Sequence, residues 1–169
     1  MSAAPRIVAP AALAALLDAD PALRRGLVLA NGIFDLLHVG HVRYLEGARA
    51  EGERLVVALN SDASARRLKG AGRPVVSLAE RLEIVAALRC VDWVTWFEED
   101  RVEGLLRLLR PAVHAKGTDY TVESVPERSV AESLGIRTAI AGDPKNHATS
   151  DLLRQLREPE GGARTGSEA

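Results

Sequence analysis

The chain has 169 residues, of which 47% are apolar, which suits a single domain with a full hydrophobic core. A net charge of −1, from 22 basic and 23 acidic residues, gives no electrostatic support for binding nucleic acid or an anionic membrane surface. Cys90 is the single cysteine, which excludes a disulfide within the chain, and its apolar neighbours predict a buried structural thiol. No apolar run approaches the roughly 18 residues of a membrane span, and the first residues lack signal-peptide features, so we expect a cytoplasmic protein.

Helices and strands are predicted in alternation along the chain, from apolar residues at helical spacing and from short apolar runs between turn signals. Ser77 and Glu80 form a capping box at the start of one helix, and Gly135 ends another. In chain order the predicted elements are a helix at Ala11–Leu17, a strand at Leu27–Ala30, a helix at Gly40–Ala50, a strand at Leu55–Leu59, a helix at Leu78–Leu88, a strand at Asp92–Trp96, a helix at Asp100–Leu109, a strand at Ala112–Ala115, a helix at Pro126–Leu134, a strand at Arg137–Ala141 and a helix at Ser150–Leu156.

This order predicts one α/β domain with a Rossmann-like, doubly wound, parallel sheet of five strands. We expect that domain over residues 27–157, preceded by a helical extension over residues 1–26 and followed by a disordered polar tail over residues 158–169. The helix in the extension packs either on its own domain or on a neighbouring chain.

Polar clusters follow four of the five predicted strands, at residues 31–41, 60–62, 116–120 and 143–150. In parallel α/β sheets, ligands bind beyond the carboxyl ends of the strands, so these clusters converge on one predicted site. A further stretch, Lys69–Pro74, contains two glycines and is predicted to be a mobile loop.

The first cluster carries His38 and His41 into the first turn of a predicted helix. Backbone N–H groups and the helix dipole attract anions at such a position, and imidazoles add hydrogen-bond donors. Gly32 and Gly40 have no Cβ, so a bulky anion can approach the backbone closely. A phosphate site explains this pattern better than a metal site, for which no third ligand stands at a recognised spacing, or than two ordinary histidines at a helix start.

The segments Gly32-Ile-Phe-Asp35 and His38-Val-Gly-His41 resemble the signature of the nucleotidyltransferase (cytidylyltransferase-like) superfamily, and the similarity extends over about Leu27 to Leu156. Further stretches are similar to one branch, the D-glycero-beta-D-manno-heptose 1-phosphate adenylyltransferase of ADP-heptose synthesis. These stretches are Asn60–Asp62, Arg67–Gly70, Arg73-Pro74, Val91–Trp93 and Lys116–Tyr120.

The resemblance implies a HIGH-type nucleotidyltransferase that transfers AMP from ATP to a sugar phosphate with release of pyrophosphate. It implies Mg²⁺ as cofactor, with no protein side chain assigned as its direct ligand. That branch is often fused to a sugar kinase, and 169 residues are too few to include one, so a separate kinase is expected upstream. The resemblance also implies a homodimer.

Residue roles follow from the same resemblance. It assigns His38 and His41 to catalysis and places Asp35 near the acceptor or the metal. Lys69, in a loop bounded by two glycines, is assigned to catalysis as a clamp for a phosphate. Arg81 is placed near the acceptor or the metal because a cation in the first turn of a helix opposes the helix dipole. From the residues alone, Asp35 is equally a turn or cap residue, Lys69 a solvated loop residue, and Arg81 either the mark of an anionic partner or a surface arginine. The residues expected to bind nucleotide or phosphate are Gly32, Ile33, Phe34, Gly40, Lys116, Asp119, Thr149 and Ser150.

One region departs from the family pattern. Ala148 stands where a serine is expected in the run before the last helix, although Thr149 and Ser150 keep their hydroxyls. Two other functions stay open: a cytidylyltransferase acting on glycerol 3-phosphate or a related alcohol phosphate, and a non-catalytic nucleotide sensor. A dinucleotide-binding oxidoreductase is disfavoured because the first turn lacks Gly-x-Gly-x-x-Gly.

Overall fold

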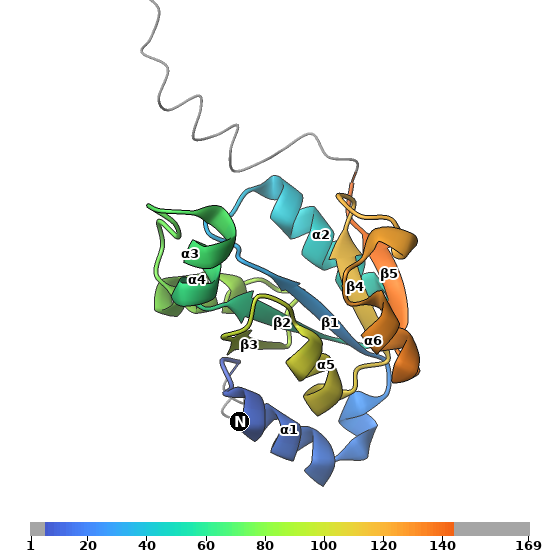
Figure 1. Ribbon diagram of the computed structural model, residues 1–169. Helices are drawn as coiled ribbons and strands as arrows, with labels where there is room; N and C mark the ends of the chain where they lie inside the picture. The colour runs from blue at the N-terminus through green and yellow to red at the C-terminus, as the bar shows by residue number, and fades with distance from the viewer. Residues whose placement is uncertain (1–5, 144–169) are drawn as a thin grey trace, which may run out of the picture.

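Five parallel strands form the centre of the molecule in the computed structural model, which describes residues 6–143 (Figure 1). The chain winds outward from β1 through β2 to β3 and then crosses back to add β4 and β5 on the other side of β1. The predicted Rossmann-like, doubly wound sheet is therefore confirmed, and its winding reverses between β1 and β4. In spatial order the strands are β3 (Trp93–Phe97), β2 (Arg54–Asn60), β1 (Leu27–Gly32), β4 (Val113–Gly117) and β5 (Arg137–Ala141).

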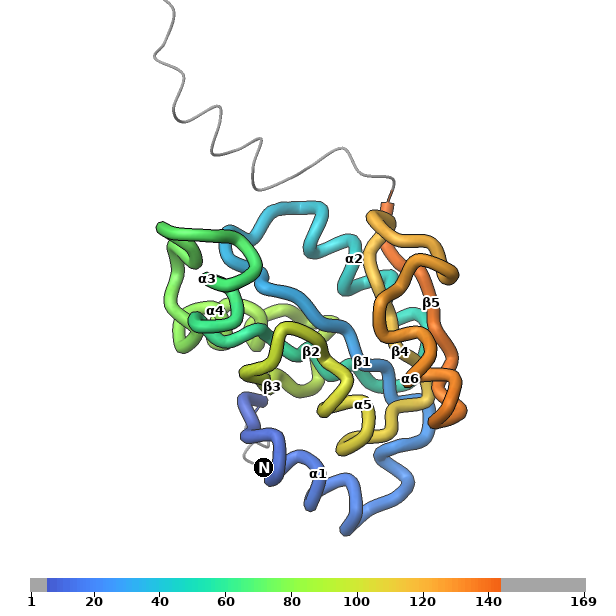
Figure 2. The backbone as a smooth tube through the Cα atoms, in the orientation of Figure 1, coloured from blue at the N-terminus to red at the C-terminus, as the bar shows by residue number. Residues whose placement is uncertain are grey.

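Helices cover both faces of the sheet, as the tube in Figure 2 shows. Side chains from α2 and α4 share one buried cluster with the sheet, and side chains from α1, α5 and α6 share the other. The helices are α1 (Pro10–Ala19), α2 (Val39–Ala50), α3 (Asp62–Lys69), α4 (Leu78–Ala86), α5 (Glu103–Leu109) and α6 (Arg128–Ser133), with short 3-10 turns η1 (Pro21–Arg24) and η2 (Val122–Ser124). None of the helices described is long and apolar enough to cross a membrane.

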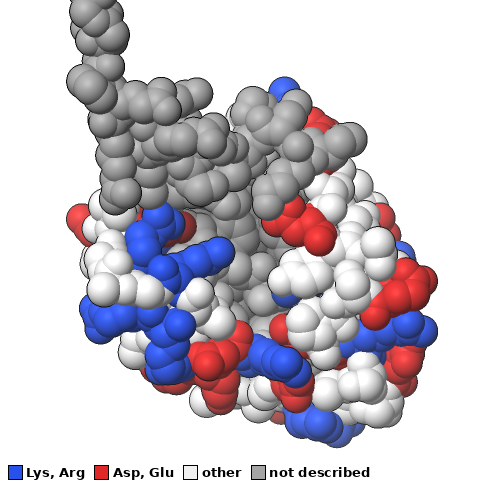
Figure 3. Space-filling model, turned by 45° about the horizontal axis from the view of Figure 1, so that its top comes forward, with Lys and Arg blue, Asp and Glu red and all other residues white. Residues whose placement is uncertain are grey.

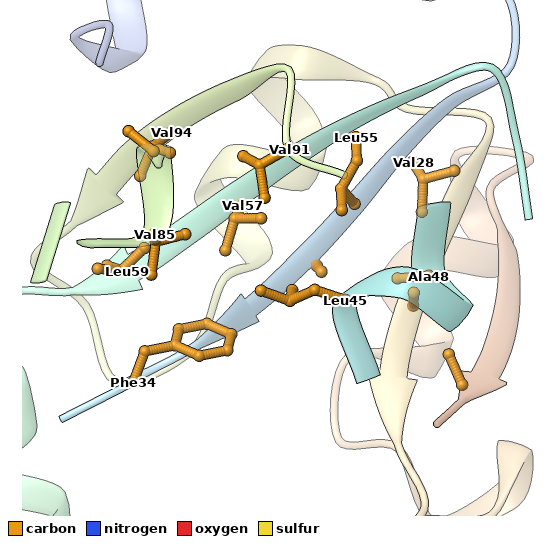
Figure 4. Close-up of a cluster of buried hydrophobic side chains, with 14 of the residues drawn as sticks. Val28, Phe34, Leu45, Ala48, Leu55, Val57, Leu59, Val85, Val91 and Val94 are labelled. Carbon is orange, nitrogen blue, oxygen red and sulfur yellow. The ribbon is translucent and has the colours of Figure 1, made fainter. Parts of the chain in front are cut away.

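Alternation along β1 divides the core between the two faces. Val28 and Ala30 belong to the cluster under α2 and α4, while Leu27 and Leu29 belong to the cluster under α1 and α5. Figure 4 shows the first cluster, in which aliphatic side chains from β2 meet those of α2 and α4. Phe34 is part of this cluster, so the turn after β1 is anchored in the core.

Most predicted elements are present with bounds that differ by one to three residues, and one helix was not predicted. α3 was not predicted, because its sequence is strongly charged and buries only Ser64 and Ala65; Lys69 is therefore the last residue of a helix and not part of a loop. α6 begins at Arg128, after a turn at Pro126. Cys90 is only partly buried, at the edge of the first cluster. The predicted helix at 150–156 lies outside the described residues.

The N-terminal segment packs on its own domain. Residues 6–8 lie beside β3, where the N–H of Val94 donates to Arg6 O at 2.7 Å and the N–H of Val8 donates to Val94 O at 2.9 Å. Leu13 and Leu17 of α1 are completely buried in the second cluster, which answers the alternative left open by the sequence.

Substitution in α1 tests whether this helix is part of the folded core. Leu13→Ala should lower the free energy of unfolding by about 2–5 kcal/mol, because a buried leucine loses its contacts and leaves a cavity. Leu16, on the same helix, is 38% exposed, and Leu16→Ala should cost much less. Urea unfolding of both variants measures the difference; equal losses would contradict the packing of α1 on its own sheet.

Candidate active site

The chain leaves β1 through a sharp turn at Phe34, whose φ of 50° lies in the left-handed region. The Phe34 ring is buried, 5.3 Å from the ring of His41 and stacked on Tyr44 at 6.3 Å. A Cβ on Gly32 would lie 3.0 Å from the Phe34 ring. The structure thus gives Gly32 a packing reason for its lack of side chain, and Ile33 and Phe34 present their backbone at the carboxyl end of β1.

His38 and His41 form a capping box at the start of α2. Nδ1 of His38 accepts the N–H of Gly40 at 3.2 Å, and Nδ1 of His41 accepts the N–H of His38 at 3.3 Å. A nitrogen that accepts a hydrogen bond carries no proton, so each neutral ring carries its proton on Nε2. The ring centroids are 3.9 Å apart, and the cap therefore aligns two N–H donors side by side.

The same arrangement keeps His41 neutral. Burial, and then the neighbouring charge of His38, lowers the pKa of His41 to about 4. At neutral pH the His41 ring therefore donates its hydrogen bond without a positive charge of its own.

Asp35, in the turn after β1, binds the segment that precedes α4. Its carboxylate accepts the N–H of Val75 at 2.8 Å and that of Val76 at 2.9 Å, and it lies 2.7 Å from Nε of Arg73. Asp35 is 4% exposed and ties the turn after β1 to the segment before α4, whereas the cap of α4 itself is Ser77.

Arg81 is completely buried, which corrects the reading of a surface arginine. Its guanidinium donates to the carbonyls of Ile33, Asn60 and Val76 and pairs with Asp62. The anionic partner inferred from its place in the first turn of α4 is therefore a carboxylate of the chain itself.

Lys69 belongs to α3 and not to the turn that carries the two histidines. It is exposed at the end of α3, whose last turn also carries Arg66 and Arg67, and Figure 3 shows basic side chains gathered on this side. Gly70 and Gly72 follow with φ of 89° and 81°, and nothing lies near their Cβ positions. Lys69 thus borders a segment that few contacts hold.

Lys116 stands at the end of β4 in a buried polar group. Its Nζ lies 3.7 Å from Oε2 of Glu127 and 4.8 Å from the centre of the Tyr120 ring. Burial lowers the pKa of Lys116, while Glu127 acts in the opposite direction. Asp119 lies in the turn after β4, and Gly117 has open space at its Cβ position. Thr149 and Ser150 lie outside the described residues.

Sequence reasoning missed the residues that join these parts. The hydroxyl of Tyr44 donates to Ala115 O at 2.8 Å, which ties α2 to β4. Nε2 of His114 lies 3.0 Å from Oδ1 of Asn31, and these side chains come from neighbouring strands. The signal for His114 was a histidine inside a predicted apolar strand. Within residues 6–143 no group of three or more His, Cys, Asp or Glu side chains could hold a metal ion.

Comparisons with known proteins identify relatives of this chain. The family model described as cytidylyltransferase-like matches residues 29–150. The bifunctional protein HldE of Geotalea uraniireducens is 49% identical over 146 residues, which is 86% of this chain and 30% of that protein. The HldE protein of Geobacter sulfurreducens is 46% identical over 144 residues, 85% of this chain and 29% of that protein. The chain thus spans less than a third of the length of these relatives.

The fold also has a solved counterpart. A crystal structure of the lipopolysaccharide core biosynthesis protein from Thermoplasma volcanium aligns with a TM-score of 0.61 at 23% identity. The alignment covers 72% of this chain and 99% of that one, and at this identity it supports the fold alone.

The buried state of His114 predicts a pH dependence of stability. Burial, and then the charge of Lys116, lowers the pKa of His114 to about 3, whereas an unfolded histidine titrates near 6.5. Between these two pH values the unfolded chain therefore binds more protons than the folded chain. The free energy of unfolding consequently decreases as the pH is lowered through this range. From pH 7 to pH 5 this group should remove about 2 kcal/mol. Urea unfolding at both pH values should show a smaller loss in His114→Gln; an unchanged loss would contradict the assignment.

Proposed function

The chain is a nucleotidyltransferase of the cytidylyltransferase-like family, and we propose that it transfers AMP from ATP to a sugar phosphate of the heptose 1-phosphate kind, releasing pyrophosphate. The observation that carries this proposal is the pair of imidazoles at the start of α2, whose Nε2–H donors stand side by side beyond the carboxyl end of β1. Such donors suit a triphosphate, which offers many acceptor oxygens in a small space.

The proposed reaction is an in-line displacement at the α-phosphorus. An oxygen of the acceptor phosphate forms the new bond while the bond to the pyrophosphate oxygen breaks, and no covalent intermediate with the enzyme is needed. His38 and His41 donate hydrogen bonds to the triphosphate, the N–H of Phe34 donates to the α-phosphate, and Lys116 adds positive charge from the β4 side. Positioning and fixed donors of this kind supply most of the rate gain in phosphoryl transfer.

The choice of acceptor rests on the relatives. They are named bifunctional proteins, this chain corresponds to about 30% of the length of one of them, and its motifs resemble the adenylyltransferase of ADP-heptose synthesis. We infer that a sugar kinase supplies the sugar 1-phosphate in the cytoplasm, where ATP is available. A homodimer, implied by the family resemblance, is part of the same proposal.

Mg²⁺ is proposed as the cofactor. Asp35 is engaged by Arg73 and two backbone N–H groups, so the described part of the site offers a triphosphate more hydrogen-bond donors than carboxylates for a metal. This donor set fits an ion held mainly by phosphate oxygens and water, as Mg²⁺ often is. When bound there, the ion neutralises charge on the leaving pyrophosphate.

A substrate panel tests the proposal. Purified protein should release pyrophosphate in the presence of Mg²⁺, ATP and heptose 1-phosphate, and should release much less with CTP, GTP or UTP. Release only with CTP and glycerol 3-phosphate or a related alcohol phosphate would replace the substrates and keep the reaction. Nucleotide binding without release for any pair would instead identify a sensor.

Two substitutions of His38 distinguish its role as a helix cap, through Nδ1, from its proposed role as a hydrogen-bond donor, through Nε2. An asparagine places its carbonyl near the position of Nδ1, so His38→Asn should keep the helix start. It removes the outward donor, and the turnover number should fall about 10²–10³-fold.

His38→Gln is the matched control, because a glutamine amide reaches the position of Nε2. It should keep more activity than His38→Asn while it loses about 1 kcal/mol of unfolding free energy with the cap. Steady-state kinetics and thermal unfolding of both variants provide the measurement. The reverse order of activities would show that the cap, and not the outward N–H, is what the reaction requires.

A further inference from the structure

Arg81 is the largest fully buried side chain among residues 6–143, and all of its partners lie at the edge of the site. Nη1 donates to Ile33 O at 2.5 Å, just beyond β1, and to Asn60 O at 3.0 Å, the last residue of β2. Nε donates to Val76 O at 3.0 Å, and Nη2 pairs with Asp62 at 2.7 Å. One rigid, planar cation thus holds together three segments of the chain: the turn after β1, the junction of β2 and α3, and the segment before α4.

The contact with Ile33 sets the direction of the next N–H group. In a trans peptide the carbonyl oxygen and the following N–H point in opposite directions. The peptide between Ile33 and Phe34 is trans, since the one cis bond of the described residues precedes Pro74. The N–H of Phe34 therefore points away from the guanidinium and from the end of β2. On the other side of β1 lies β4, across the point where the winding reverses and where ligands of such sheets bind.

That N–H has no hydrogen-bond partner among the described residues, although Phe34 is only 5% exposed. The left-handed backbone conformation of Phe34 costs about 1–3 kcal/mol, and such a conformation persists only where the surrounding structure enforces it. Arg81 enforces it from the carbonyl side, and the packing of the ring against His41 and Tyr44 enforces it from the core. The result is a rigid donor aimed into the site.

Asp35 provides a second link between the turn after β1 and the segment before α4. Asp35 accepts the N–H groups of Val75 and Val76, while Arg81 donates to the carbonyl of Val76. The turn after β1 and the segment before α4 are therefore linked through two buried charges of opposite sign, and neither charge needs a substrate to balance it.

We propose that Arg81 is a positioning residue that aims the N–H of Phe34 at one non-bridging oxygen of the α-phosphate. The inference rests on the proposed function, because it takes the α-phosphorus as the reacting centre. As the acceptor oxygen bonds to phosphorus and the pyrophosphate oxygen departs, this N–H stays bonded to the non-bridging oxygen. The attacking oxygen belongs to a phosphate anion, so no proton has to move. Arg81 acts on the rate without touching either substrate.

The test uses ATP in which sulfur replaces one of the two non-bridging α-oxygens. The two diastereomers of this analogue present sulfur at different positions, so a donor aimed at one oxygen makes the enzyme prefer one of them. Arg81→Lys keeps the positive charge but cannot hold three carbonyls and a carboxylate in one plane. We expect its turnover number to fall about 10²-fold with a smaller change in KM, and its preference between the diastereomers to approach one.

Asp62→Asn is the matched control. It removes the charge partner of Arg81 on the more exposed side and leaves the contacts with the three carbonyls in place. It should lower the unfolding free energy yet keep the wild-type preference between diastereomers. If Arg81→Lys is slower but also keeps that preference, Arg81 supports the fold alone and the proposal is overturned.

A measurement on the unmodified protein covers the case in which Arg81→Lys does not fold. The amide proton of Phe34 should move downfield in the NMR spectrum when α,β-methylene ATP binds, because it gains a charged acceptor. An unchanged Phe34 resonance at saturating nucleotide overturns the proposal. Turnover of the wild type with CTP but not ATP would instead contradict the proposed nucleotide substrate, ATP. The same test of Arg81 would then use the CTP analogues with sulfur at the α-phosphate.

Discussion

The chain must turn from the end of β1 into α2 within the six residues 33–38, and the candidate site depends on how it does so. The left-handed backbone of Phe34 gives the sharpest part of this reversal, and its ring enters the core under α2. Because the ring packs against His41 and Tyr44, the turn and the helix are one packed unit. The position of the two imidazoles beyond the end of β1 is therefore fixed by packing in the core.

The start of α2 shows one side chain performing two tasks with different atoms. Each imidazole uses Nδ1 to accept a backbone N–H, and the proposed function uses Nε2 as the hydrogen-bond donor. The helix end would otherwise leave these N–H groups without partners. A lysine offers no acceptor atom and so cannot take either position without loss of the cap. This explains in physical terms why histidine suits both positions.

The sequence predicted the strands and their winding, because buried parallel strands are short apolar runs that alternate with helices. β5 was predicted with the bounds that the structure has, and the box of Ser77 and Glu80 marked the start of α4. α3 was missed because a helix that buries so little has no apolar periodicity.

The site was predictable in part for a related reason. The residues that stand together in one segment, from Gly32 to His41, were found from their local pattern. The partners of Arg81 and the contact between Asn31 and His114 join residues far apart in the chain, and no local pattern marks them. A charged residue in the first turn of a helix indicated an anion near Arg81, but only the fold identifies that anion as Asp62.

The hydroxyl of Tyr44 has a consequence for how the two halves of the sheet are held together. It joins α2, which follows β1, to Ala115 of β4, and so it bridges the two oppositely wound halves of the sheet. Burial raises the pKa of Tyr44 well above its usual range, so this bridge keeps its proton at any ordinary pH. On the opposite flank, the segment after α3 has glycines with no neighbours near their Cβ positions. The α2 and β4 side of the site is therefore held by the hydrogen bond from Tyr44 to Ala115, whereas nothing packs against the Cβ positions of Gly70 and Gly72 on the other flank.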